Sequence, residues 1–150
     1  MEVCYVQKTH SLLILTMVAV ALVTATSALV TIQQTINGTG SIKGVGMGIY
    51  WDLQCTNETS SLNWGMLEPG SSNSFTLYLR NEGNSALTLG ITAENWNPAN
   101  AADYMTLTWN RQGQQINPNE VVIFVITLSV SENVQGISSF SFDTTISGTG

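Results

Sequence analysis

Apolar and polar residues alternate with a period of two between residues 67 and 93. The apolar positions of this stretch are Phe75, Leu77, Leu79, Leu87, Leu89 and Ile91. This period predicts two half-buried β-strands. Between them, residues 81–85 read Asn-Glu-Gly-Asn-Ser, residue types that favour reversal of the chain. We therefore expect a β-hairpin or the corner of a β-sandwich here.

Similar alternation elsewhere predicts further strands, and no segment after residue 28 has a helical period. The expected strands cover residues 29–36, 41–51, 104–109, 121–130 and the stretch around Phe140, Phe142 and Thr144. Residues 121–130 are apolar on both faces, as in a central strand. In residues 41–51, glycines 44, 46 and 48 alternate with apolar residues. We expect one strand here, with no side chains on its glycine face, so that another backbone can lie close to that face. Roughly seven short strands predict an all-β fold, an antiparallel two-sheet sandwich that is jelly-roll or immunoglobulin-like.

The first 28 residues have the pattern of a secretory signal peptide. Lys8 precedes an apolar run over residues 12–23, and Thr26 and Ala28 are small residues suited to positions −3 and −1 of a cleavage site. We expect cleavage after Ala28, so that the protein is extracellular and meets the membrane only during export. Two alternatives keep the apolar run: an uncleaved membrane anchor, and a type IV pilin-like subunit whose apolar helix packs in a filament.

A short alternating segment follows the expected cleavage site. Residues 29–36 predict an N-terminal strand with Val30, Ile32 and Ile36 on one face, and pairing within its own molecule is the usual fate of a first strand. Residues 37–41, Asn-Gly-Thr-Gly-Ser, predict a flexible hinge. The expected organisation is a signal peptide over 1–28, a strand and hinge over 29–40, and a β-sandwich domain over 41–150.

Composition and charge exclude several classes of function. The chain is 43% hydrophobic and 9% charged, which favours a folded core over disorder. Its net charge of −6 leaves no basic surface for nucleic acid. The single histidine, His10, lies in the segment expected to be removed, and the carboxylates are scattered singly. We therefore expect no enzymatic activity, cofactor or metal. A calcium site in the loop with Asn97, Asn100 and Asp103 is not expected either, because these residues lack the spacing of a calcium-binding loop.

Three further features concern the surface. Loss of Cys4 with the signal leaves Cys55 without an intrachain partner, either as a small buried residue or in a disulfide between subunits. Asn37 and Asn57 begin the glycosylation sequences Asn-Gly-Thr and Asn-Glu-Thr, both in expected loops. The rings of the four tryptophans either stack on a bound carbohydrate or, as is more common for tryptophan, pack in the core. They are Trp51, Trp64, Trp96 and Trp109.

Three segments of the chain resemble archaeal bundling-pilus subunits related to the TasA and camelysin biofilm-fibre family. They are residues 48–57 (GIYWDLQCTN), 63–72 (NWGMLEPGSS) and 79–84 (LRNEGN). The resemblance covers nearly the whole chain after the signal, and it implies a jelly-roll subunit. In such subunits the N-terminal strand of one copy completes the sheet of the next, and the fibres bundle in a biofilm matrix.

Carried onto this chain, the resemblance implies a donor strand at residues 29–36, with Leu29, Val30, Ile32 and Ile36 as the inserted residues. Its implied partners are identical subunits arranged head to tail, and neighbouring filaments in bundles. Camelysin relatives are known as metalloproteases, but the expected mature chain has neither a histidine nor a His-Glu-x-x-His motif, so peptidase activity does not carry over. The remaining alternatives are the type IV pilin-like subunit and a monomeric surface sandwich that binds carbohydrate or a protein partner.

Overall fold

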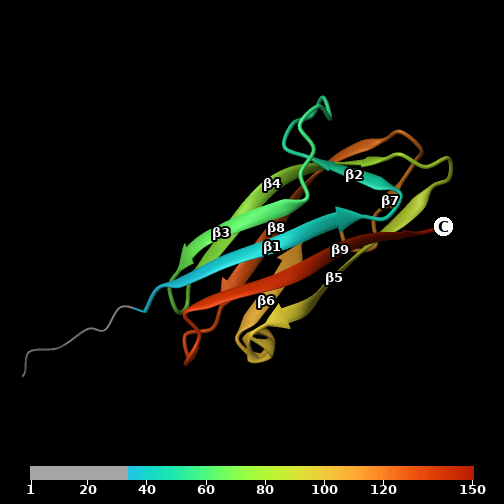
Figure 1. Cartoon of the computed structure of the whole chain (residues 1–150). Helices are drawn as coiled ribbons and strands as arrows, with labels where there is room; N and C mark the ends of the chain where they lie inside the picture. Colours follow the sequence, from blue (N-terminus) through green and yellow to red (C-terminus); the bar gives the residue numbers. More distant parts are fainter. Residues whose placement is uncertain (1–33) are drawn as a thin grey trace, which may run out of the picture. The chain divides into compact units, whose positions relative to one another are not determined.

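The computed structural model describes residues 34–150, which form nine β-strands and one short 3-10 helix (Figure 1). The elements are β1 (Ile36–Gly44), β2 (Met47–Tyr50), β3 (Ser61–Leu67), β4 (Ser72–Asn81), β5 (Leu87–Asn97), η1 (Ala99–Asp103), β6 (Met105–Trp109), β7 (Gln115–Ile116), β8 (Val121–Val130) and β9 (Ser139–Thr149). Within this part of the chain, no helix is long and apolar enough to span a membrane. The expected signal segment, with its cleavage site at Ala28, lies outside the described residues, as do Leu29, Val30 and Ile32.

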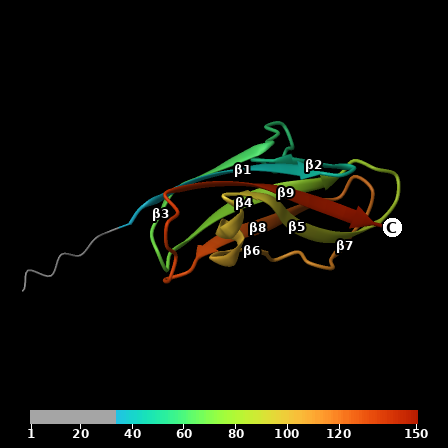
Figure 2. The same cartoon turned by 60° about the horizontal axis from the view of Figure 1, so that its bottom comes forward.

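The strands form two sheets, which confirms the all-β sandwich class. The five-stranded sheet has the order β3-β1-β9-β5-β7 and the four-stranded sheet the order β2-β4-β8-β6 (Figures 1 and 2). A single hydrophobic core contains side chains of both sheets, among them Ile42 and Trp64 of the first sheet and Leu79 and Phe124 of the second. Burial of these alternating apolar residues is the main driving force that holds the sheets together.

The stretch over residues 67–93 forms a sandwich corner rather than a hairpin, because β4 lies in the four-stranded sheet and β5 in the five-stranded sheet. The fully buried Asn81 ties this corner together. Its Nδ2 donates to the carbonyls of Ser85 (2.8 Å) and Ile116 (3.4 Å), and its Oδ1 accepts from the Gly83 amide (3.0 Å). The turn-forming residues therefore reverse the chain by bonding to a buried amide.

Three other strand predictions are confirmed. Residues 121–130 form β8, a central strand between β4 and β6. Residues 105–109 form β6, and residues 139–149 form β9, whose Phe140, Phe142 and Thr144 are buried on one face. Burial alternates along β8 as well, although its residues are apolar on both faces, so that Ile123 on the outer face is exposed.

The predicted hinge at residues 37–41 is wrong, because these residues belong to β1 in the middle of a sheet. β1 pairs antiparallel with β3 and parallel with β9, so the five-stranded sheet is mixed rather than purely antiparallel. Gly38 lies against the ring of Phe140, where a Cβ atom would overlap that ring. Gly40 would carry its Cβ 3.3 Å from Trp64 Nε1. Glycine is therefore used here for close packing against aromatic rings, not for flexibility.

The strand predicted over residues 41–51 is divided into β1 and β2. The chain turns at Gly46, whose φ of +70° is in the left-handed region that favours glycine. This turn carries the chain from the five-stranded to the four-stranded sheet. The glycine alternation therefore marks a crossover and not a continuous strand with a bare face.

Candidate functional site

One side of the sandwich leaves apolar side chains incompletely covered. On β5, Ile91 and Ala93 lie opposite Ile146 and Thr144 of β9. Both of these partners are buried, so Ile91 and Ala93 also face the core. By the same reasoning, Leu107 and Trp109 of β6 face inward, opposite Leu128 and Ile126 of β8. All four are only partly buried. We call this set the β5–β6 seam.

Both strands of the seam have a free edge within residues 34–150. β6 pairs only with β8, and β5 has β7 beside it only at Leu87 and Thr88. η1 connects the two strands at one end of the seam. At the other end, the loop after β6 returns to β5, where the Gly113 amide donates to the Leu89 carbonyl (2.8 Å). The seam is thus bounded at both ends and lacks a strand between them.

The opposite side of the sandwich is closed. Its edge strands, β2 and β3, carry inward apolar residues that are all at most 6% exposed. They are Met47, Ile49, Leu62, Trp64 and Leu67. Because the two sides differ in this way, the partial exposure at the β5–β6 seam is a local property and not a general feature of strands at a sheet edge.

Of the four residues expected to be inserted, only Ile36 falls in the described part of the chain. Ile36 begins β1, pairs with Leu67 and is fully buried in its own domain. The structure thus places Ile36 in the core of its own domain, whereas the expectation placed it in the sheet of the next subunit. Just before it, Gln34 Nε2 donates to the Ile137 carbonyl (2.8 Å). The domain is consequently anchored from Gln34 onward.

A polar groove of about 490 Å³ crosses the outer face of the five-stranded sheet. Its lining includes the side chains of Thr39, Ser41, Ser61, Asn95, Ser141 and Asp143, from strands β3, β1, β9 and β5. The Asp143 carboxylate accepts hydrogen bonds from Ser41 Oγ (2.5 Å) and Asn95 Nδ2 (2.8 Å). These bonds hold the pKa of Asp143 below its usual value.

A β-bulge shapes the β5 side of this groove. The pairing of β5 with β9 shifts register between Glu94 and Asn97, and Asn95 has a positive φ of 55°. The one extra residue on β5 places both Asn95 and Asn97 at the groove. Bulges commonly redirect side chains in this way beside binding sites.

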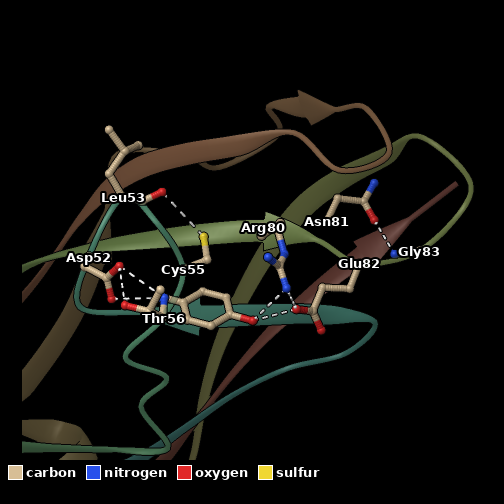
Figure 3. A network of polar contacts seen from close by, with 9 residues as sticks. Asp52, Leu53, Cys55, Thr56, Arg80, Asn81, Glu82 and Gly83 are labelled. Carbon is tan, nitrogen blue, oxygen red and sulfur yellow. Dashed lines mark hydrogen bonds and ion pairs between the residues drawn. The ribbon is translucent and has the colours of Figure 1, made fainter.

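A second polar network lies beside the loop after β2 (Figure 3). Tyr50 Oη donates to Glu82 Oε1 (2.6 Å), and the Arg80 guanidinium donates to the same oxygen (2.6 Å) and lies over the Tyr50 ring. The bond to Glu82, with burial and the carboxylate charge, raises the pKa of Tyr50 to about 12. Donation by Tyr50 and Arg80 lowers the pKa of Glu82. The network joins β2 to the end of β4.

Cys55 lies in this loop and is neither deeply buried nor paired within residues 34–150 (Figure 3). Its φ of 56° is unusual for a residue other than glycine, and Asp52 caps the loop by accepting from the amides of Thr56 and Asn57. Cys55 is thus only partly buried, in contrast to the first of the two expected alternatives, and the disulfide between subunits stays a prediction. Desolvation raises the pKa of its thiol, so the thiolate is disfavoured.

The glycosylation candidates differ in setting. Asn57 is exposed in the loop after β2, as expected, whereas Asn37 is exposed on β1 and does not lie in a loop. Among the tryptophans, Trp64 is 1% exposed, and Trp96 stacks on Phe142 at 4.2 Å between ring centroids. Trp109 packs edge-on against Phe124. Trp64 belongs to the core, Trp96 and Trp109 are partly buried and pack against it, and Trp51 is 39% exposed.

Within residues 34–150, no group of three or more His, Cys, Asp or Glu side chains could hold a metal ion. Sequence reasoning missed both the seam and the groove. The alternation identified which side chains of β5 and β6 face inward, but only the strand order shows that they lack a covering neighbour. Comparisons with known protein families and with curated proteins found no match to this chain.

Proposed function

We propose that this chain is a non-enzymatic, secreted subunit of an extracellular pilus that polymerises by donor-strand complementation and bundles in cell adhesion or a biofilm matrix. The subunit is a jelly-roll-type sandwich, and a segment of one copy completes the sandwich of the next. The single observation that carries this proposal is the β5–β6 seam. It combines free backbone edges with apolar side chains that an added strand would cover.

An added strand stabilises such a seam in two ways. Its backbone would satisfy amides and carbonyls along a free edge, each hydrogen bond contributing about 0.5–1.5 kcal/mol. Its apolar side chains would remove Ile91, Ala93, Leu107 and Trp109 from water. A single row of apolar residues at alternate positions, such as Val30 and Ile32, matches this requirement because one face of the strand then points into the core.

The donor segment in this proposal is residues 29–33, with Leu29, Val30 and Ile32 as the inserted residues. It is shorter than the segment expected from sequence, because Ile36 is used within its own domain. The joint between subunits is then confined to the few residues before β1, since the glycines of β1 are packed in a sheet. A head-to-tail contact that does not close on itself propagates into a filament.

Blocking the seam tests this proposal. Ala93→Arg places a long charged side chain at the partly buried face of β5, and we expect the secreted protein to remain monomeric by analytical ultracentrifugation. The matched control is Thr92→Arg, which adds the same side chain on the exposed outer face of the same strand and should polymerise normally.

A second variant is needed because the charged side chain of Ala93→Arg can itself destabilise the domain. Leu107→Thr removes apolar area from the seam without adding bulk or charge, and we expect shorter or less stable polymers. Circular dichroism of both variants checks that the β-sheet signal is retained. Normal polymerisation by folded Ala93→Arg protein would show that the seam does not receive a strand.

A further inference from the structure

The polar groove of the five-stranded sheet is an open depression lined by hydroxyl, amide and carboxylate side chains. Its volume of about 490 Å³ lies within the range of ligand pockets. It crosses β3, β1, β9 and β5 on the face that points away from the core. The β5–β6 seam involves inward-facing side chains of both sheets, so the two sites use opposite faces of β5.

Two rows of paired residues run across the floor of the groove. In one row Ser41 lies between Ser61 and Asp143, and in the next Thr39 lies beside Ser141. Neighbouring strands are about 4.8 Å apart, so hydroxyl groups repeat at short intervals across the sheet. Each hydroxyl donates one hydrogen bond and accepts two. The floor thus offers donors and acceptors in close alternation.

Asp143 gives the groove a fixed acceptor. Ser41 and Asn95 hold its carboxylate by two hydrogen bonds, and a carboxylate has about four lone-pair positions. Acceptor positions therefore remain for hydroxyl donors of a ligand. A charge-assisted bond of this kind is roughly twice as strong as a neutral one.

The charge of the lining restricts the ligand. Asp143 is the one charged residue among the groove-lining residues, and none of them is Lys or Arg. An anionic ligand such as a phosphate or an acidic sugar would meet the Asp143 carboxylate at the lining, and the nearby cation, Lys43 of β1, already interacts with that carboxylate. A metal ion would require more acidic ligands than the single one present. The lining instead matches a neutral ligand rich in hydroxyl groups.

We propose that the polar groove binds a neutral saccharide, with Asp143 as the fixed hydrogen-bond acceptor and Thr39, Ser61, Asn97 and Ser141 as further partners. Two sources supply this chemistry. One is a separate glycan, and the other is a glycan attached to Asn37, which lies on β1 two residues from Thr39 and is exposed on the same face. With a separate glycan as ligand, the groove would be an adhesive site. With the Asn37 glycan as ligand, the groove would bind a glycan attached to the same chain.

The test is binding of fluorescently labelled neutral trisaccharides, namely mannotriose, maltotriose, cellotriose and chitotriose, measured by fluorescence anisotropy on the full secreted protein. We expect at least one to bind, with about tenfold weaker affinity in Asp143→Asn and in Ser141→Ala. Asp143→Asn keeps the shape of the side chain and its place in the sheet. The control Thr88→Ala removes an exposed hydroxyl from β5 outside the groove and should leave affinity unchanged.

A third variant, Asn37→Gln, distinguishes the two sources. Equal affinity in wild type and Asn37→Gln indicates a separate glycan as the ligand. Tighter binding in Asn37→Gln, by about tenfold or more, indicates that the attached glycan occupies the groove. Absence of binding to both proteins, or equal binding by wild type, Asp143→Asn and Ser141→Ala, would overturn the proposal. Repeating the measurement on Ala93→Arg separates this inference from polymerisation, since saccharide affinity should not change there.

Discussion

Phe140 of β9 lies directly over Gly38 of β1, leaving no room for a side chain at position 38. The two residues are register partners in the parallel pairing of β1 with β9. This contact explains why a segment rich in glycine forms a central strand. Residues 37–41 therefore do not form a flexible hinge.

Replacing Gly38 by alanine should therefore be costly. The added methyl group would displace the Phe140 ring, and overpacking of this kind destabilises a core by about 1–3 kcal/mol. The change in unfolding free energy is measured by urea denaturation. The matched control is Gly90→Ala in β5, where a Cβ would lie at an ordinary 3.4 Å from Ser147 Oγ; we expect a change within about 0.5 kcal/mol there. Equal stability of the two variants would contradict the packed arrangement of β1.

The buried amide of Asn81 should be needed for the corner between β4 and β5. Asn81→Ala removes the donor to the Ser85 and Ile116 carbonyls and the acceptor of the Gly83 amide. Leaving such groups without partners costs about 1–3 kcal/mol, measurable by thermal unfolding. Asn84→Ala, at an exposed position of the same turn, should cost less than about 0.5 kcal/mol. A loss no larger than that of Asn84→Ala would show that the corner does not depend on this amide.

The phenol of Tyr50 should ionise only at high pH, because its hydrogen bond to Glu82 raises its pKa. Its pKa is raised to about 12, so its contribution to stability is fully present below the ordinary value near 10 and is lost as the pH rises through about 12. Glu82→Gln removes the negative charge that opposes ionisation and should lower the pKa of Tyr50. The measurement is the tyrosinate absorbance of each protein, minus that of the same protein carrying Tyr50→Phe. An unchanged titration in Glu82→Gln would refute the coupling.

Strands in which apolar and polar residues alternate could be predicted from the sequence, because burial of one face of a strand requires apolar residues at every second position. β6 and β9 are examples, and Phe142 and Leu107 show the expected inward orientation. The Asn-Gly-Thr-Gly-Ser segment was misinterpreted because local propensity favours flexibility, whereas packing against Phe140 decides the structure. Long-range packing of this kind leaves little local signal.

Neither candidate site could be predicted from the pattern of apolar and polar residues along the sequence. The seam depends on β6 being the edge of one sheet and on β5 being paired with β7 only at Leu87 and Thr88 in the other, which is a property of strand order. The groove depends on a register that brings Ser41 beside Asp143, residues far apart in sequence. The polar positions themselves, at alternate residues of β1 and β9, were visible in the sequence, but their neighbours across the sheet were not.

The most direct test of strand donation compares two proteins by light scattering, one beginning at Leu29 and the other at Gln34. The shorter protein keeps the bond from Gln34 to Ile137 and the buried Ile36, so its own domain should fold normally. The account predicts filaments from the protein that begins at Leu29 and monomers from the one that begins at Gln34. The same particle size for both proteins would contradict strand donation by residues 29–33.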